Sequence, residues 1–202
     1  MDHVAAAKYL LRYICGTTST GYGITLGRCS ETPWQPLFKV LSGSDWGMGD
    51  TRKLISGFLI MMNDLLLSWI SKQQAVVALS SCEAEYLATH CAHDVLWFCN
   101  LFAELGFTQS QPTSLFCDNQ GMVACTHNPH AHSKMKHILI CEHFIRNCVM
   151  KWLIDVIHVS NKENTADLLT KRLHHILHTR WIKMLQLDPV EGVLQFDTAS
   201  QP

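Results

Sequence analysis

The sequence has no apolar run long enough to cross a bilayer. Its most apolar stretch, residues 58–70, is interrupted by Asn63 and Asp64 and is shorter than the about 20 residues that a membrane-spanning helix needs. The amino terminus lacks the basic and then apolar pattern of a secretory leader, and no repeat or low-complexity tract occurs. We therefore expect a soluble chain with no membrane partner, located in the cytoplasm or nucleus.

An excess of charge is also missing. The chain has 16 Lys and Arg against 17 Asp and Glu, a formal net charge of -1. Proteins that bind nucleic acid through overall charge are strongly basic, which this chain is not. Any nucleic-acid partner must therefore be held by a local basic patch.

The nine cysteines include no C-x-x-C pair, and their number is odd. Most lie inside apolar segments, which favours reduced core thiols over a disulfide framework. The Cys and His residues between positions 125 and 141 lack the paired spacing of a zinc finger, so we do not favour a zinc site there.

The apolar periodicity predicts one domain of strands and helices. Strands are expected at 22–26, 37–42, 56–62, 65–71, 75–79, 114–117 and 152–159, and helices at 4–13, 82–105, 122–125, 133–150, 165–171 and 174–187. Asn63 and Asp64 are the expected turn of a hairpin, and Gly106 is the expected end of a helix. This order predicts an α/β layer sandwich with a mixed sheet. We expect a lead-in at 1–36, the domain at 37–187 and a tail at 188–202.

Three acids occupy comparable places in this scheme. Glu85 lies early in a helix, Asp118 directly after a strand and Asp167 near the start of a late helix. Strand ends and helix starts meet at one edge of such a sandwich, so the three carboxylates are expected to converge. Carboxylates without basic partners suit Mg²⁺ and a phosphate substrate, which points to two-metal phosphodiester hydrolysis.

The short sequence motifs, or phrases, around these acids are specific. The phrases are VALSSCEAEY at 77–86, FCDNQ at 116–120, KHI at 136–138 with HFIR at 143–146, and TADLLTK at 165–171. In this order, they resemble the ribonuclease H region of Pol polyproteins from copia-type LTR retrotransposons. The phrases around Trp46, Gly57 and Trp69 also fit, so the resemblance covers about residues 3–187, and 1–36 is similar to the tether that follows reverse transcriptase.

The resemblance implies a ribonuclease H-like fold with a five-stranded mixed sheet. It also implies an endonuclease that uses two Mg²⁺ ions to hydrolyse the RNA strand of an RNA:DNA hybrid. Glu85, Asp118 and Asp167 match three of the four metal-binding acids. We expect the Pol reverse transcriptase and integrase to be absent from this chain, and no small-molecule substrate is implied.

The first acid of the family pattern is missing. The phrase that carries it reads Ser42-Gly43-Ser44-Asp45-Trp46, with Gly43 at its position. Asp45 is a candidate substitute only if the loop folds back, because it lies about 6.7 Å further along a strand. We therefore expect little or no nuclease activity. The alternatives are an active enzyme that uses Asp45 and a binding module that does not cut.

Candidate nucleic-acid contacts lie in loops and helix starts around the expected crevice. His137 is a candidate residue near the scissile phosphate. The other candidates are Arg52, Lys53, Lys72, Asn119, Gln120, Lys134 and Lys136.

Overall fold

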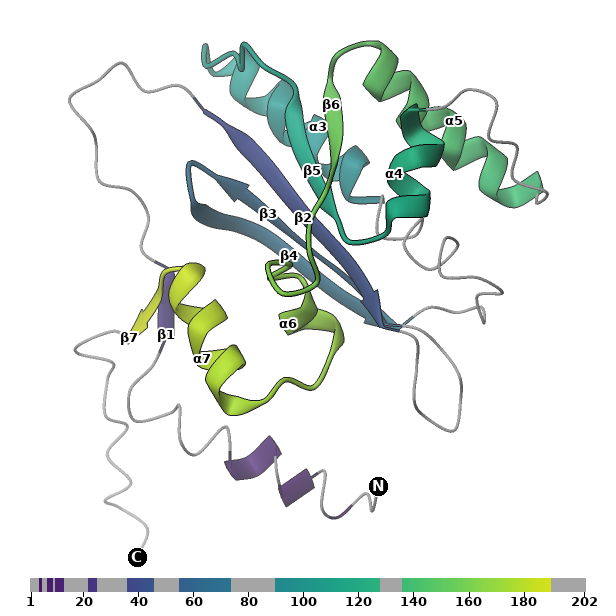
Figure 1. Ribbon diagram of the computed structural model, residues 1–202. Coiled ribbons are helices and arrows are strands. Elements are labelled where there is room, and N and C mark those ends of the chain that lie inside the picture. Colours follow the sequence, from purple (N-terminus) through teal and green to yellow (C-terminus); the bar gives the residue numbers. More distant parts are fainter. Residues whose placement is uncertain are drawn as a thin grey trace, which may run out of the picture.

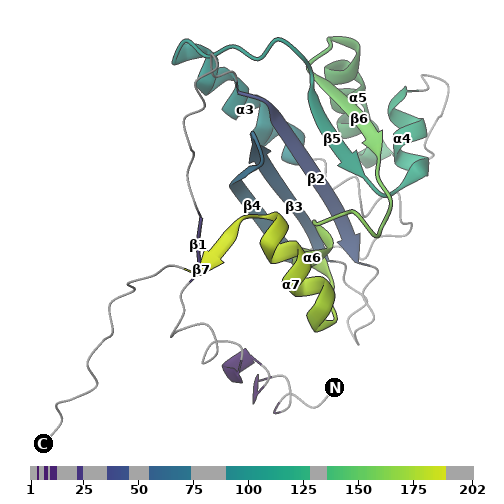
Figure 2. The same ribbon diagram turned by 60° about the vertical axis from the view of Figure 1, so that its left-hand side comes forward.

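The computed structural model shows a mixed β-sheet with helices on both faces (Figures 1 and 2). It describes residues 4, 7, 8, 10–12, 22–24, 36–45, 55–73, 90–127 and 136–189. The expected strand at 75–79 and the first part of the expected helix at 82–105 lie outside this range. Within the described part of the chain, no helix is long and apolar enough to span a membrane.

Five strands form the central sheet in the order β4-β3-β2-β5-β6. Their bounds are β2 Phe38–Asp45, β3 Ile55–Met62, β4 Leu65–Gln73, β5 Thr113–Cys117 and β6 Ile154–His158. β2, β3 and β4 pair antiparallel, whereas β5 pairs parallel with both β2 and β6. The expectation of a five-stranded mixed sheet is therefore confirmed.

The β3–β4 hairpin forms where the sequence predicts it. Asn63 and Asp64 both have positive φ values, 49° and 69°. Two such residues make the turn whose twist matches a hairpin, and Asn and Asp adopt that conformation more easily than most residues. The turn is also tied to β2, because the backbone N–H of Leu37 donates to Oδ1 of Asn63 over 2.7 Å.

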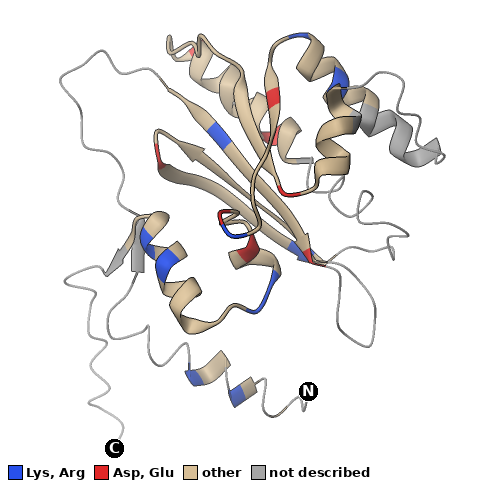
Figure 3. Cartoon of the chain, viewed as in Figure 1, with Lys and Arg blue, Asp and Glu red and all other residues tan. Residues whose placement is uncertain are grey.

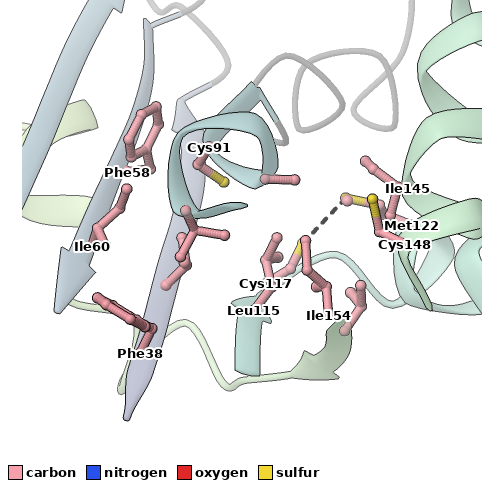
Figure 4. Close-up of a cluster of buried hydrophobic side chains, with 14 residues drawn as sticks. Phe38, Phe58, Ile60, Cys91, Leu115, Cys117, Met122, Ile145, Cys148 and Ile154 are labelled. Carbon is pink, nitrogen blue, oxygen red and sulfur yellow. Dashed lines mark hydrogen bonds between the residues drawn. The ribbon is translucent and has the colours of Figure 1, made fainter. Parts of the chain in front are cut away.

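Alternating side chains of the sheet make two separate cores. On one face, Phe38, Val40, Phe58 and Ile60 are buried against helices (Figure 4). On the other face, the intervening residues, including Leu41 and Leu59, pack against later parts of the chain. Because side chains alternate along a strand, both faces of β2 and β3 are buried, and β3 is nearly continuously apolar.

Three helices cover the first face: α3 His90–Glu104, α4 Gln120–His127 and α5 Lys136–Met150. α3 ends as expected at Gly106, which has a φ of 90°. The N–H of Phe107 donates to the carbonyl of Phe102 over 2.8 Å, and the N–H of Gly106 donates to that of Ala103 over 3.0 Å. This pair of bonds is a Schellman motif, which satisfies carbonyls at the helix end.

The second face carries α6 Asp167–Thr170 and the end of α7 His175–Met184. α7 is shorter than the expected helix at 174–187, because the chain turns at Leu185 and Gln186 and then forms β7 Leu187–Pro189. β7 pairs antiparallel with β1 Tyr22–Ile24 in a small second sheet. This pairing joins the expected lead-in to the start of the expected tail.

Candidate functional site

The carboxyl ends of the parallel strands meet at one edge of the sheet. Asp45 is the last residue of β2, and Asp118 directly follows β5. The two strands are aligned so that Ser42 lies beside Cys117. Acidic residues thus gather at the ends of β2 and β5 and on α6 (Figure 3). This edge is where α/β proteins commonly build their sites.

A pair of glycines lets α6 approach the sheet closely. Gly43 of β2 and Gly57 of β3 are directly opposite each other in the antiparallel ladder. A Cβ atom at Gly57 would lie 2.8 Å from Cβ of Leu169, closer than real Cβ atoms come. A Cβ atom at Gly43 would lie 3.5 Å from Oδ1 of Asp167. The segment that carries Asp167 therefore lies directly over the glycine pair.

Asn164 anchors this segment to β2. Its side chain is fully buried, and Nδ2 donates to the carbonyl of Ser42 over 2.8 Å. Its Oδ1 accepts from the N–H of Ala166 over 3.2 Å. On the other side, Oγ of Ser71 in β4 donates to the carbonyl of Leu169 over 2.7 Å. Side-chain bonds at both ends thus hold α6 beside Gly43.

Asp167 is buried and paired with a cation from its own helix. Only 5% of the residue is exposed, and Nζ of Lys171 lies 2.7 Å from Oδ1, one helical turn along the chain. Burial raises the pKa of the Asp167 carboxyl, and the hydrogen bond and charge of Lys171 oppose that shift. The negative charges of Asp118 and Asp45 raise this pKa further. The three carboxylates are therefore close enough to interact.

Asp118 has an oxygen that is available for a ligand. Its Oδ1 is buried and has no hydrogen-bond partner within the residues that the structure describes. The next residue, Asn119, caps α4, because its Oδ1 accepts from the N–H of Met122 over 3.1 Å. This cap fixes the start of α4 and places Asp118 between strand and helix.

The structure places only part of the predicted site. Glu85, Arg52, Lys53 and Lys134 lie outside the described residues. Lys136 and His137 are in the first turn of α5, but their side chains are outside the described part. Lys72 is exposed on the edge strand β4, and Gln120 is exposed at the start of α4.

The described donors do not fit the pair of Mg²⁺ ions that the resemblance implies. Two such ions lie about 4 Å apart and need an anionic ligand between them to offset their repulsion. Gly43 supplies no side-chain oxygen there, and Asp167 is already paired with Lys171. Across the described ranges, no group of three or more His, Cys, Asp or Glu could hold a metal ion.

Three residues that shape the site were not predicted for that role: Asn164, Lys171 and Gly57. Asn164 lies between the expected strand at 152–159 and the expected helix at 165–171. Lys171 and Gly57 belong to the sequence motifs that carry the resemblance, and this membership is the sequence signal that could have singled them out. The contacts of Asn164 and Gly57 join distant parts of the chain, which the local pattern does not reveal, whereas Lys171 meets Asp167 at a local spacing of four residues.

Comparison with known proteins gives long sequence matches to Pol polyproteins. The chain is 38% identical over 197 residues to the retrovirus-related Pol polyprotein from transposon RE2 of Arabidopsis thaliana, a match that covers 95% of this chain and 13% of the relative. It is 36% identical to the Pol polyprotein from transposon TNT 1-94 of Nicotiana tabacum, over 84% of this chain and 12% of the relative. The chain therefore spans only about an eighth of the length of these relatives.

A search of protein-family profiles finds no match. Among solved structures, the N-terminal RNase H domain of Rv2228c from Mycobacterium tuberculosis, fused to maltose-binding protein, superposes with a TM-score of 0.50. That alignment covers 74% of this chain and 98% of the solved chain at 14% identity, so it bears on the fold alone. The chain is thus a homologue of one segment of copia-type retrotransposon Pol polyproteins, and it has a ribonuclease H-like fold.

Proposed function

We propose that this chain is a ribonuclease H-like domain that binds RNA:DNA hybrid and has lost most of the hydrolytic activity of its family. In this proposal the sheet edge at Asp118 and Asp167 is the former catalytic centre. The family reaction is the metal-dependent hydrolysis of the RNA strand. Glycine at position 43 is the reason why that reaction is impaired here.

One observation carries the proposal. The Cβ position of Gly43 lies 3.5 Å from Oδ1 of Asp167, so a carboxylate on that carbon would enter the same pocket. This is the position at which the family phrase has its first acid. The side-chain atom nearest to this Cβ position is Nδ2 of Asn164, at 3.2 Å, and it would need to move by a few tenths of an ångström. A Cβ atom at position 43 would therefore fit beside Asp167 after a small shift of Asn164.

Within this proposal, Asp118 and Asp167 are the residues that remain for a divalent cation such as Mg²⁺, together with Glu85. Their oxygens have the hard character that Mg²⁺ prefers, but without an acid at position 43 they do not make the two-ion centre that the family reaction uses. Asp167 contributes less than in an intact centre, because Lys171 already neutralises it. Arg52, Lys53, Lys72, Asn119, Gln120, Lys134 and Lys136 are the proposed hybrid contacts, and His137 is proposed to lie near the cleavage point.

The test compares the unchanged chain with Gly43→Asp on a labelled RNA:DNA hybrid, with Mg²⁺ or Mn²⁺. We expect tight binding by both proteins and cleavage of the RNA strand only by Gly43→Asp. Gly43→Asn is the matched control, since it adds a similar volume without the charge, and it should remain inactive. Cleavage by the unchanged chain at the rate of Gly43→Asp would refute the proposed impairment.

The alternative of an active enzyme rests on Asp45. Its charge acts on Asp167, so it lies near the pocket. β2 continues through Asp45, which pairs with Ile55 of β3, so this residue is held at the end of a strand. If the unchanged chain cleaves hybrid and Asp45→Asn abolishes that cleavage, Asp45 acts as the substitute. Because the proposed ligand is a nucleic acid, we also propose that the chain acts in the cytoplasm or nucleus.

A further inference from the structure

Basic residues are concentrated near the carboxyl end of the described chain. The 17 residues from 171 to 187 contain Lys171, Arg172, Arg180 and Lys183 and no Asp or Glu, although the whole chain has a net charge of -1. Lys171 is committed to Asp167. Arg180 and Lys183 are exposed on α7, and neither forms an ion pair with any residue that the structure describes. Figure 3 shows these basic positions on α7 and in the loop before it.

The two sides of α7 differ in character. Trp181 and Leu185 are 1% and 2% exposed, and Leu185 packs on the sheet with Leu41 and Leu59. The opposite side borders an open groove of about 510 Å³, lined by Ile176, Thr179, Arg180, Lys183 and Met184. These residues follow the spacing of one helix face. Ile176 and Met184 are 73% and 51% exposed, so the α7 side of the groove has exposed apolar ends and a basic middle.

We propose that this groove of α7 binds the sugar-phosphate backbone of nucleic acid, outside the acidic site. Arg180 and Lys183 are three residues apart on one face, which places their Cβ atoms about 5–6 Å from each other, so two charges are presented together. The Thr179 hydroxyl adds a hydrogen-bond donor for a phosphate oxygen. Ile176 and Met184 provide apolar surface for the sugars. Backbone contacts of this kind depend on charge and carry no sequence preference.

The location fits the same ligand as the proposed function, on which this inference rests. α7 begins four residues after Lys171, whose ammonium contacts Asp167 at the acidic site. A helix of ten residues is about 15 Å long, so α7 would extend the contact by several nucleotides beyond that site. The amino-terminal helical residues of the chain fit this groove poorly, because they include Lys8 and Arg12, which Arg180 and Lys183 would repel.

The test measures binding of a labelled RNA:DNA hybrid by fluorescence anisotropy over a range of KCl concentrations, in EDTA so that no cleavage occurs. Arg180→Gln and Lys183→Gln should each weaken binding by about 3–10-fold and lower the slope of log K against log salt by about 1. Lys151→Gln is the matched control, since it removes one exposed charge at the far end of the sheet. It should bind as the unchanged chain does.

The outcomes separate this inference from the proposed function. If the unchanged chain binds and both α7 variants keep its affinity and salt slope, the α7 inference is wrong and the proposed function stands. If the unchanged chain fails to bind hybrid at all, both are wrong. A polyglutamate probe that binds the groove as tightly as hybrid, and loses affinity in the same variants, would also overturn the inference in favour of an acidic protein partner. Circular dichroism melts should show equal folding of all variants.

Discussion

The Cβ position of Gly43 lies 3.5 Å from Oδ1 of Asp167, although the two residues belong to a strand and a helix far apart in the chain. Asp167 has instead a cation as its close neighbour, with Nζ of Lys171 at 2.7 Å from the same oxygen. Lys171 therefore partly neutralises the negative charge of Asp167. Adding an acid at position 43, or removing the cation of Lys171, should thus change the stability of the protein as well as its activity.

Gly43→Asp should make the stability of the protein depend on divalent cations. In EDTA the added carboxylate repels Asp167 and Asp118, and we expect the free energy of unfolding to fall by about 1–3 kcal/mol. Millimolar Mg²⁺ should restore much of this loss, because a ligand that binds only the folded state stabilises it. Urea unfolding with and without Mg²⁺ checks this. Gly43→Asn, as the control, should show no Mg²⁺ effect, and an unresponsive Gly43→Asp would contradict the expectation.

Lys171→Met should leave the buried carboxylate of Asp167 without its cation. Because the Lys171 side chain is 30% exposed and that of Asp167 is 7% exposed, we expect a loss of about 1–3 kcal/mol in the free energy of unfolding. Adding Asp167→Asn to this variant should recover part of the loss, which a double-mutant cycle in urea measures. Lys162→Met, at an exposed turn, should change stability by less than about 0.5 kcal/mol. Equal effects of the two Lys variants would argue against the ion pair.

Asn164→Ala should release the segment that carries Asp167. The substitution leaves the carbonyl of Ser42 without its 2.8 Å donor and removes the acceptor for the N–H of Ala166. Since both groups are buried, we expect a loss of about 2–3 kcal/mol. Hydrogen exchange at Ala166 should also become faster, relative to the unchanged chain. Asn161→Ala, in the exposed part of the same turn, is the matched control, and slow exchange retained in Asn164→Ala would exclude the anchoring role.

Gly57→Ala should displace α6 from the sheet. The added Cβ atom would lie 2.8 Å from Cβ of Leu169 and 2.9 Å from Cγ2 of Thr170, and neither is the end of a flexible side chain. We expect a loss of about 1–3 kcal/mol from this overpacking. The coupling energy between Lys171 and Asp167 should also fall, because the helix that holds both residues moves. Unchanged stability would mean that α6 is packed less closely than the structure indicates.

The buried thiols should be unreactive in the folded protein. Cys91 and Cys148 are 0% and 3% exposed, and burial raises the pKa of both. Alkylation with iodoacetamide followed by peptide mass mapping should therefore label them only in urea, because the thiolate is the reactive form. Labelling of Cys91 in the native state as fast as in urea would show that the core opens readily.

The same buried thiols should make the protein less stable in alkaline solution. Their pKa values are higher in the folded state than the value of about 9 in the unfolded chain, so the unfolded chain loses these protons first as the pH rises. The free energy of unfolding should fall above about pH 9, by up to about 1.4 kcal/mol per pH unit for Cys91 and by less for Cys148. Urea midpoints at increasing pH check this, and Cys91→Ala should show a shallower decline.

Local sequence patterns were sufficient for much of the fold. Alternating apolar residues predicted the strands on either side of Asn63 and Asp64, and these two residues take the positive φ values that a tight hairpin requires. Gly106 ends α3 as expected. These features depend on the conformational preferences of a few neighbouring residues, so a short window of sequence contains their cause. Asp118 follows a strand and Asp167 begins a helix, as expected, and that these two acids form one site stays a prediction.

Contacts between distant segments were decided only by the tertiary structure. Gly43 lies opposite Gly57, Asn164 bonds to Ser42 across 122 residues, and β1 pairs with β7 near the other end of the chain. The Lys171–Asp167 ion pair has a local spacing of four residues, but the burial of Asp167 depends on the same packing of α6 on the sheet. The sequence by itself determined that position 43 is glycine and that positions 118 and 167 are acids, because these are facts of composition and order. Which atoms lie next to that glycine was decided by strand pairing and close packing. The free energy of both depends on atoms brought together from many parts of the chain.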